Sequence, residues 1–222
     1  MSKKCRLIFS KTGKAQYISH LDLMHAFQRS FVRAGIMLRH SEGFNPHPYM
    51  SIILPLSVGQ ESVCEVMDIE LLHDDEDIDG ILLKINDVLP EGIEAIGCCE
   101  PVMKAKELTW LRVHCELIYD GGVSEEFCSA LSDFYGKDEI VIDKKSKRGI
   151  SKTDIRPMIY SAEFAVSGKN VIVLDAVLAA QNPSLNPSAM LSALEQLKPE
   201  LKPDFCKIMR RAVYNADMKE FE

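Results

Sequence analysis

Two imidazoles, a hydroxyl, an amide and a carboxylate are concentrated in one short segment, Arg39–Pro48 (RHSEGFNPHP). Histidine titrates near neutral pH and is the commonest general acid or base, and the glycine and prolines of this segment restrict its backbone. A rigid loop with this content is typical of a site that holds a ligand. The alternative is that its polar groups only satisfy the loop's own backbone, as Asn and Ser commonly do in turns. The candidate binding residues of the loop are His40, Ser41, Gly43, Phe44, Asn45 and His47.

An amphipathic helix is expected to lead into this loop. The hydroxyl of Ser19 can accept a hydrogen bond from the backbone N–H of Asp22, which predicts a helix that begins at about His20 and is stopped by Gly35. One face of this helix is apolar and is expected to pack on a sheet; it consists of Leu23, Met24, Phe27, Ser30, Phe31 and Ala34. The opposite face either joins the loop in a binding surface or is simply solvated. The candidate binding residues of the helix are Ser19, His20, Asp22, His25, Arg29 and Arg33.

The helix and loop carry a family resemblance. The runs SHLDLMHAFQRSFVRAGI (19–36), SEGFNPHP (41–48) and LPLSVGQES (54–62) resemble the N-terminal signature of an uncharacterised bacterial family of radical-SAM-linked proteins, which are encoded beside or fused to a radical-SAM protein. The resemblance covers about the first 70 residues and extends more loosely to a basic segment followed by Asp154–Pro157 (DIRP). The family has no known activity, so the resemblance implies a radical-SAM protein as a partner and does not imply a reaction.

The composition indicates a cytoplasmic globular protein. With 222 residues, of which 46% are hydrophobic, the chain can bury one large core or two small ones. No apolar run approaches the roughly 18 to 20 residues that cross a membrane, and the basic N-terminus lacks the apolar stretch of a secretory signal. The seven cysteines are scattered, which is typical of buried residues in a reducing compartment and not of a disulfide framework.

No bound cofactor is expected. A radical-SAM enzyme holds its iron–sulfur cluster with three closely spaced cysteines, whereas the most closely spaced cysteines here are the pair Cys98 and Cys99. The chain is therefore not itself a radical-SAM enzyme. The six histidines show none of the short spacings of zinc-binding motifs. A zinc site built from His40, His47 and a distant cysteine is an open alternative.

The formal net charge of −7 argues against a protein that coats nucleic acid non-specifically, because phosphate binding requires a basic surface. The charge is uneven along the chain. Acidic residues crowd positions 74–79, before a predicted helix whose N-terminus they would stabilise. A basic stretch in the second half is either a docking surface or a solvated loop; it contains Lys144, Lys145, Lys147, Arg148, Lys152 and Arg156.

The order of predicted elements is repeated along the chain. Periodicity and turn residues predict, in the first half, strands at Cys5–Phe9, Tyr49–Leu56, Ser62–Leu72 and Ile93–Cys99, and helices over 20–35 and Ile78–Leu89. The second half restarts with strands at Leu111–Tyr119, Glu139–Asp143, Met158–Val166, Asn170–Leu178 and Cys206–Tyr214, and with helices that begin after Ser124 and Asn186.

This order predicts an α+β fold of two tandem ferredoxin-like (βαββαβ) units with antiparallel sheets. Residues 1–103 would form the first domain, which carries the helix and loop, and residues 104–222 the second, which carries a basic insertion. The loop at 40–48 is expected to line a cleft between the two copies.

Three functions are compatible with these features. The first is a non-catalytic accessory module that presents RNA or a protein substrate to a radical-SAM enzyme. The second is an RNA-acting enzyme, because tandem ferredoxin-like chains resemble the CRISPR-repeat endoribonucleases, and the LD dipeptide at 21–22 resembles that of pseudouridine synthases; its catalytic candidates are His20, Asp22 and His47. The glycine-rich loop of those nucleases is missing, since the last glycine is Gly168. The third is a small-molecule or metal-binding protein that uses the histidine loop.

Overall fold

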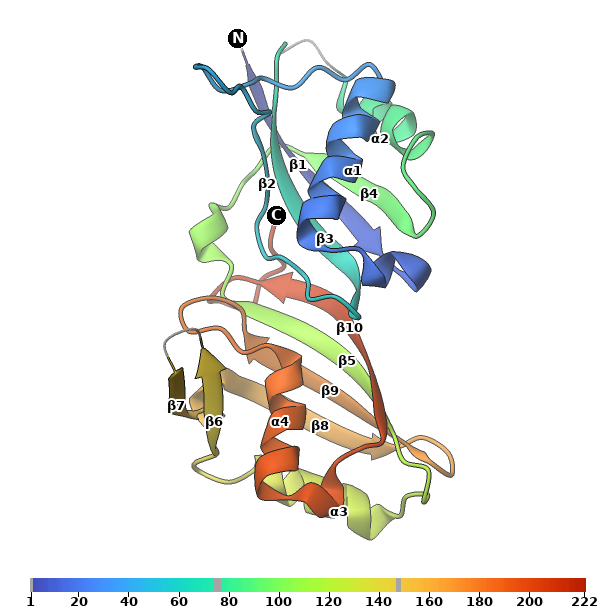
Figure 1. Ribbon diagram of the computed structural model, residues 1–222, viewed down its shortest axis with the longest axis vertical. Helices are drawn as coiled ribbons and strands as arrows, with labels where there is room; N and C mark the ends of the chain where they lie inside the picture. Colours follow the sequence, from blue (N-terminus) through green and yellow to red (C-terminus); the bar gives the residue numbers. More distant parts are fainter. Residues whose placement is uncertain (1, 74–76, 147–148) are drawn as a thin grey trace. The chain divides into compact units, whose positions relative to one another are not determined.

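We describe the protein from a computed structural model, which covers residues 2–73, 77–146 and 149–222 (Figure 1). It is a mixed α+β protein with antiparallel sheets and, within these ranges, four α-helices. The chain divides into two compact units, which we call unit 1 (Met1–Glu107 with Glu220–Glu222) and unit 2 (Leu108–Lys219). No helix within the described ranges has the length and apolar character that a membrane span requires.

Unit 1 is built on an antiparallel sheet whose strands lie in the order β4-β1-β3-β2. Their bounds are β1 Lys3–Lys11, β2 Met50–Ile52, β3 Glu61–Leu71 and β4 Ile93–Cys99. Successive side chains of a strand point to opposite faces of the sheet. Cys5 and Leu7 of β1 are therefore buried on one face, and Lys4 and Arg6 lie on the other.

Two helices, α1 (His20–Arg33) and α2 (Ile78–Asn86), cover the same face of this sheet (Figure 1). Apolar residues of both helices enter one core with the inward residues of the strands. The rings of Phe9 and Phe27 meet edge to face in this core, with centroids 4.8 Å apart. The apolar face predicted for α1 is buried or half-buried, so that prediction is confirmed.

Both ends of α1 are also where the sequence predicts them. The side chain of Ser19 caps the helix by accepting a hydrogen bond from Asp22 N at 3.2 Å. Gly35 follows the last turn with φ of 69°, a left-handed conformation that glycine adopts without steric cost. The helix therefore delivers the chain into the loop at a defined angle.

Two elements of unit 1 are shorter than predicted. β2 ends at Ile52 and not at residue 56, because Pro55 has no N–H to donate to a strand ladder. α2 ends at Asn86 and not at residue 89. The side-chain amide of Asn86 bonds both N and O of Ala95 at 2.8 Å, which fixes this end of the helix to β4.

Unit 2 has an antiparallel sheet in the order β10-β5-β9-β8. The bounds are β5 Trp110–Ile118, β8 Ile159–Val166, β9 Val171–Ala179 and β10 Phe205–Tyr214, with helices α3 Glu125–Tyr135 and α4 Pro187–Leu197. The predicted helix starts are confirmed, because Ser124 accepts a hydrogen bond from Phe127 N at 3.2 Å and Asn186 accepts one from Ser188 N at 3.0 Å. The predicted pairing of β8 with β9 is confirmed as well.

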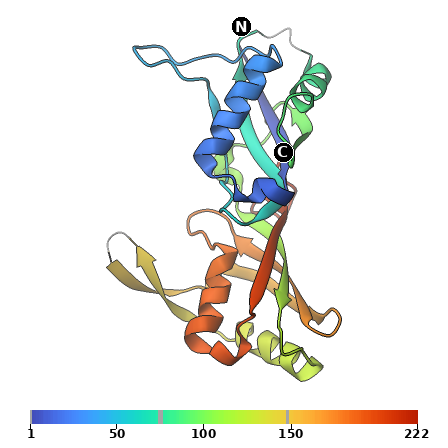
Figure 2. The same cartoon turned by 45° about the vertical axis from the view of Figure 1, so that its right-hand side comes forward.

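The basic stretch forms a hairpin of β6 (Val141–Ser146) and β7 (Gly149–Asp154), which extends away from the sheet of unit 2 (Figure 2). The sequence predicted a strand at 139–143 followed by a basic stretch that either docks a partner or is a solvated loop. The second strand was missed because Ile150 is its only apolar side chain, so it lacks the apolar alternation that indicates a strand, although the β-branched residues Ile150 and Thr153 favour one. Several predicted charges lie outside the described residues, namely Asp74, Asp75, Glu76, Lys147 and Arg148.

Candidate functional site

The predicted binding loop is closed on itself by Ser41 and His47. Ser41 N donates to the carbonyl of His47 at 2.9 Å, and His47 N donates to Ser41 Oγ at 3.1 Å. His40 Nδ1 lies 3.0 Å from the carbonyl of Leu38. The polar groups of the loop therefore satisfy part of its own backbone, which was the alternative reading of the sequence. The exposed tip of the loop consists of Gly43, Phe44 and Asn45.

The Ser41 hydroxyl also lies 2.9 Å from Nδ1 of His47, a distance at which a histidine can act as base toward a serine nucleophile. In this loop the same oxygen accepts the main-chain N–H of His47. The contact therefore closes the loop and orients the imidazole, which lines the cleft described below.

The helix residues of the predicted site lie on the exposed face of α1. Ser19 Oγ donates to Asp22 Oδ2 at 2.7 Å, so both side chains are engaged at the start of the helix. At the other end, Arg33 donates to the carbonyl of Val88 at 3.1 Å. The remaining candidates on this exposed face are His20, His25 and Arg29.

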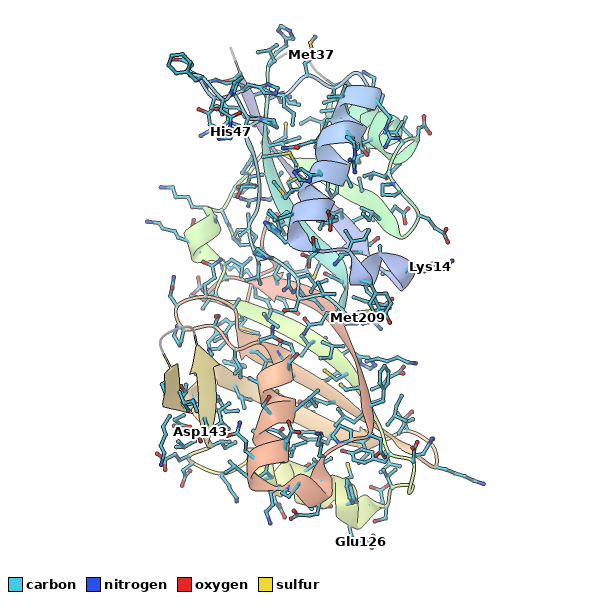
Figure 3. All side chains as sticks on the ribbon, in the orientation of Figure 1. Lys14, Met37, His47, Glu126, Asp143 and Met209 are labelled. Carbon is cyan, nitrogen blue, oxygen red and sulfur yellow. The ribbon has the colours of Figure 1, made fainter. Side chains whose placement is uncertain are left out.

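The structure does not bring the predicted residues into one pocket. His47 lines a cleft beside β1 and β3, His40 lines a groove at the end of α1, and Arg29 and Arg33 border a hollow on α1 itself. The N-terminal turns of α1 line none of these three hollows. Figure 3 shows His47 far from Lys14, which lies close before α1 at the other end of unit 1. The single receptor expected from residues 19–48 is therefore divided into separate sites.

The largest of the three hollows is a cleft of about 570 Å³ on the sheet face that α1 and α2 leave uncovered. Its size is within the range of sites that bind small ligands or single residues of larger ones. The walls come from β1, β3, the segment 47–51 that runs into β2, and the segment 101–105 that follows β4. Its polar and aromatic lining consists of Lys4, Arg6, His47, Tyr49, Ser51, Asp68, Glu70 and Lys104.

Arg6 anchors one wall of this cleft. Its Nε and Nη2 donate to the two carboxylate oxygens of Asp68 at 2.7 and 3.0 Å, and its Nη1 donates to the carbonyl of Met103 at 2.9 Å. Phe221 places its ring 4.6 Å from the guanidinium carbon. Arg6 is only 1% exposed. Its planar guanidinium contacts Asp68, Met103 and Phe221, and these contacts fix its orientation. The side chain thus fixes two separate chain segments to the outer face of the sheet.

Glu70 lies two residues from Asp68 on β3 and contributes to the same face of the sheet. Hydrogen bonds from the Ser2 hydroxyl at 2.6 Å and from Arg39 at 2.7 Å lower the pKa of Glu70. The hydrogen bond to Glu70 also raises the pKa of Arg39, whose guanidinium carbon lies 5.4 Å from the ring centre of Tyr49. The carboxylate therefore stays ionised at neutral pH and holds Arg39 over the aromatic ring.

The cleft carries excess positive charge in a protein whose net charge is −7. The carboxylates of Asp68 and Glu70 are each neutralised by an arginine partner. Lys4 lies opposite Glu70 in the β1–β3 ladder, and its charge helps to lower the pKa of that carboxyl group. Neither the Lys4 nor the Lys104 ammonium is within ion-pair distance of a carboxylate of the described residues. Two ammonium groups that are in no close ion pair with a described residue, beside an aromatic wall, suit a ligand that is anionic and has a flat or apolar part.

Apart from His47, the residues of the cleft were not predicted as site residues. A signal was present, because β1 alternates Lys4 and Arg6 with buried residues while β3 alternates Asp68 and Glu70 in the same way. Using this signal requires knowing that two strands separated by 62 residues are neighbours. Sequence periodicity alone does not supply that information.

The predicted basic patch of unit 2 is only partly available to a ligand. Arg156 donates to the carbonyls of Lys137 at 3.0 Å and Ile159 at 2.8 Å, so its role is to hold the base of the hairpin. Lys144 and Lys152 are exposed on the hairpin strands. The lysines located on the described hairpin are Lys144, Lys145 and Lys152.

Among residues 2–73, 77–146 and 149–222, no three His, Cys, Asp or Glu side chains are grouped closely enough to bind a metal ion. The described residues therefore do not form the zinc site of His40, His47 and a cysteine that the sequence left open. The seven cysteines are present as free thiols.

One protein-family model, described as "Uncharacterized protein conserved in bacteria" (DUF2344), matches residues 4–187. No curated protein matches the chain. Among solved structures, the chain is similar to one entitled "Crystal Structure of an Unknown Protein from Galdieria sulphuraria", with 11% identity, coverage of 95% of this chain and 99% of that chain, and a TM-score of 0.25. A similarity this weak supports no conclusion about fold or function.

Proposed function

This chain belongs to the DUF2344 family of uncharacterized proteins conserved in bacteria, and we propose that it is a non-catalytic module that holds RNA for a radical-SAM enzyme. The observation that supports RNA binding is the unit 1 cleft, where the ammonium groups of Lys4 and Lys104 line the same hollow as the aromatic rings of His47 and Tyr49. The radical-SAM partner is inferred from the resemblance of residues 19–62 to radical-SAM-linked proteins. We place the protein in the cytoplasm, the compartment that its scattered cysteines favour.

Single-stranded RNA offers phosphates and flat bases, which proteins bind with cations and aromatic faces. The rings of His47 and Tyr49 lie with centroids 6.4 Å apart and form an aromatic wall of the cleft. Lys4 and Lys104 line the same cleft and can neutralise phosphates. Phe44 at the tip of the adjoining loop is fully exposed, so its ring is available for a second base.

The net charge of the chain limits binding to this local site. A protein at −7 repels the phosphate backbone over most of its surface, so affinity must come from the few nucleotides that enter the cleft. An acidic peptide would also be attracted by the lysines, but its carboxylates bring no flat ring to the aromatic wall. The wall therefore favours RNA over an acidic peptide.

We also propose that each unit is ferredoxin-like and that the chain is a tandem duplication. In both units the strand that is first in sequence pairs with the last and the third, and the second lies at the edge, if β6–β7 is counted as an insertion. In both units a helix follows the first and the third of these strands. This is the order of the split βαβ arrangement.

A cysteine pair at matching positions supports the duplication. In unit 1, Cys98 of β4 lies opposite Leu7 of β1, which is two residues after Cys5. In unit 2, Cys206 of β10 lies opposite Leu117 of β5, which is two residues after Cys115. In each pair a hydrogen bond between the two thiols is the main cause of a raised pKa, that of Cys98 in unit 1 and that of Cys115 in unit 2. An identical diagonal placement in both sheets is expected if the two units descend from one copy.

Fluorescence anisotropy with a labelled single-stranded RNA of about 12 nucleotides tests the cleft. Replacing Lys4 and Lys104 together with alanine is expected to weaken binding at least tenfold. The slope of log K against log salt should fall by about 1.4, since each lost phosphate contact contributes about 0.7 on single strands. The matched control removes the same charge elsewhere, with Lys14→Ala and Lys169→Ala at exposed positions outside the cleft, and should leave affinity and slope unchanged.

The aromatic wall is tested separately with Tyr49. Tyr49→Ala is expected to weaken RNA binding by about 5- to 150-fold, because stacking is worth about 1–3 kcal/mol per base, whereas Tyr49→Phe should retain it. Tyr17, which is 67% exposed in unit 1, gives the control variant Tyr17→Ala. The RNA proposal fails if the wild-type chain binds no RNA, if the controls lose as much affinity as the cleft variants, or if an acidic peptide binds the cleft more tightly. Turnover of RNA by the purified chain would contradict the non-catalytic role.

The partner is tested by affinity purification of the tagged chain from its native host. Co-purification of a radical-SAM protein together with RNA is the expected result, and the amount of RNA should fall with the Lys4 and Lys104 variant. Recovery of RNA without a radical-SAM protein would remove the partner while leaving the cleft proposal in place.

A further inference from the structure

A groove of about 450 Å³ lies at the C-terminal end of α1 and is lined mainly by apolar side chains. Its buried residues are Phe31, Ile36 and Leu38. Three further lining side chains are largely open to solvent: Val32, Met37 and Leu72, which are 78%, 53% and 42% exposed. Exposed apolar residues are normal when scattered, but when they gather around a hollow they mark an interaction surface.

The groove continues along α1 into a shallower hollow, because Gln28 and Val32 line both. Arg29 and Arg33 border this second part and lie one helical turn apart. Arg29 forms no ion pair with a described residue, and Arg33 donates to the carbonyl of Val88 while its charge stays without a carboxylate partner in the described chain. The apolar strip therefore ends at two guanidinium groups that are available to a ligand.

The charges that face the groove are of one sign. Arg29, Arg33 and His40 are the titratable side chains among the described residues of the two hollows, and none of these lining residues is an Asp or Glu. The C-terminus of α1 contributes a partial negative charge of about half a unit. Two full positive charges outweigh it, so the groove favours a partner that carries carboxylates.

We propose that this groove binds an apolar segment of another protein that carries acidic side chains at one end. The apolar residues of the segment would cover Val32, Met37 and Leu72, and its carboxylates would pair with Arg29 and Arg33. Aliphatic side chains line most of the groove, its one phenylalanine is buried, and its one exposed ring is the imidazole of His40, so an apolar protein segment covers more of this lining than stacked RNA bases do. The groove and the cleft have only Pro48 in common among their lining residues. A protein segment can therefore occupy the groove whether or not the cleft binds RNA.

The test uses two synthetic peptides of about 14 residues with leucines at helical spacing. One peptide carries glutamates at its remaining positions and the other carries lysines. Each is titrated into the full-length chain with labelled methionine methyl groups, and the resonance of Met37 is followed. The acidic peptide is expected to shift this resonance with saturable binding, and the basic peptide is expected to bind at least tenfold more weakly.

Variants then locate the binding site. Val32→Glu places a carboxylate in the groove and is expected to weaken binding of the acidic peptide at least tenfold, and Arg29→Ala combined with Arg33→Ala should do the same. The control is Leu83→Glu, because Leu83 is an equally exposed apolar residue, 74% exposed, on α2 and outside the groove. This control should bind the acidic peptide like the wild-type chain.

The outcomes separate the groove from the cleft. Unchanged RNA affinity in the Val32→Glu variant, with peptide binding lost, supports the groove as a separate protein-binding site. The groove proposal is overturned if the basic peptide binds as tightly as the acidic one, if Leu83→Glu loses as much affinity as Val32→Glu, or if single-stranded RNA displaces the acidic peptide from the Met37 region. Loss of RNA binding in Tyr49→Ala with peptide binding intact would support the cleft and leave the groove proposal standing.

Discussion

The two units differ most in the connection between their first helix and the next strand of the sheet. In unit 1 this connection is the loop 34–49, which is closed by Ser41 and His47 and lines the cleft and the groove. In unit 2 it is the longer segment 136–158, which contains the β6–β7 hairpin. Apart from this connection, the strands of the two sheets follow the same order. The connection after the first helix thus differs in length and in structure between the two units, and only in unit 1 does it supply residues to the cleft and the groove described above.

The outer faces of the two sheets differ as well. Arg6 follows Cys5 on β1, and Glu116 follows Cys115 on β5, so the two charged residues occupy matching positions. Arg6 is buried under the segments that wall the cleft, whereas Glu116 forms a surface ion pair with Lys207 at 2.9 Å. At this pair of positions, therefore, unit 1 has a buried cation that forms part of its cleft, and unit 2 has a solvent-exposed carboxylate.

The largest expected difference in the free energy of unfolding is between variants that remove these two matching charges. Arg6→Leu leaves the Asp68 carboxylate and the Met103 carbonyl without their donor and is expected to destabilise the protein by about 2–3 kcal/mol. Glu116→Leu breaks an exposed pair and should cost about 0.5 kcal/mol or less. Denaturant unfolding of both variants measures the difference. Equal costs would show that the covered face of unit 1 does not depend on Arg6.

For the cysteine pairs, in contrast, the two units are expected to lose the same stability on substitution. Cys5 and Cys115 are both buried at matching positions. Replacing either one with alanine removes a sulfur atom from a packed core and is expected to cost about 1 kcal/mol in both cases. A clear loss of stability in one variant and none in the other, measured by the same unfolding experiment, would speak against equivalent positions.

Alkaline pH should separate the stabilities of the two units. Burial raises the pKa of Tyr119 and Tyr135 in unit 2, so the folded unit keeps these protons when the unfolded chain loses them. Their contribution is fully present below about pH 10 and is lost as the pH rises further. Thiols with a raised pKa act in the same direction as the tyrosines but occur in both units, Cys98 and Cys99 in unit 1 and Cys115 and Cys128 in unit 2, so they do not separate the units. Burial lowers the pKa of Lys11 in unit 1, which has the opposite sign: the contribution of Lys11 to the stability of unit 1 rises as the pH increases through the lowered pKa toward 10.5.

Unit 2 is therefore expected to unfold first on titration with base. The single tryptophan, Trp110, reports on unit 2 by its fluorescence, and the methyl resonance of the buried Met67 reports on unit 1. Tyr135→Phe should lessen the alkaline loss while costing about 1 kcal/mol at neutral pH, because its hydroxyl donates to the carbonyl of Met190 at 2.8 Å. Simultaneous loss of both signals, unaffected by the substitution, would contradict this account.

Substitutions in the basic hairpin are expected to change stability and RNA affinity least. Lys144→Ala combined with Lys152→Ala removes two exposed charges and should change the free energy of unfolding by less than about 0.5 kcal/mol. RNA affinity, measured by anisotropy, should fall less than about threefold, because these lysines have no aromatic wall beside them. A larger loss than in the cleft variants would move the RNA site from unit 1 to unit 2.

Local features of the fold were predictable from the sequence. Helix α1 was predicted with its cap and its buried face, because Ser19, Asp22 and the apolar spacing act within a few residues of one another. The early end of β2 and the second strand of the hairpin were not predicted, since a proline stops the first ladder and polar residues break the apolar alternation of the second. The domain boundaries expected at 103 and 104 are untested, whereas the return of residues 220–222 to unit 1 has no local signal at all.

The candidate site was predictable only in part. The loop at 40–48 was recognised from its composition, and His47 does line the cleft. The partners of the cleft come from strands that are distant in sequence, so opposite charges such as Arg6 and Asp68 could be matched only after the pairing of β1 with β3 was known. Asp22 stays a predicted site residue; in the structure its carboxylate accepts a hydrogen bond from Ser19 at the helix start, and it lines none of the three hollows described above.

The most direct test of the RNA cleft is photo-crosslinking of the wild-type chain to a single-stranded RNA that contains 4-thiouridine, followed by mass spectrometry of the crosslinked peptides. Crosslinks at Tyr49 and at the loop around Phe44 are the expected result, and they should disappear when unlabelled RNA competes. Crosslinks confined to the hairpin 141–154, or none above the level of a control protein of similar charge, would contradict the assignment of RNA binding to unit 1.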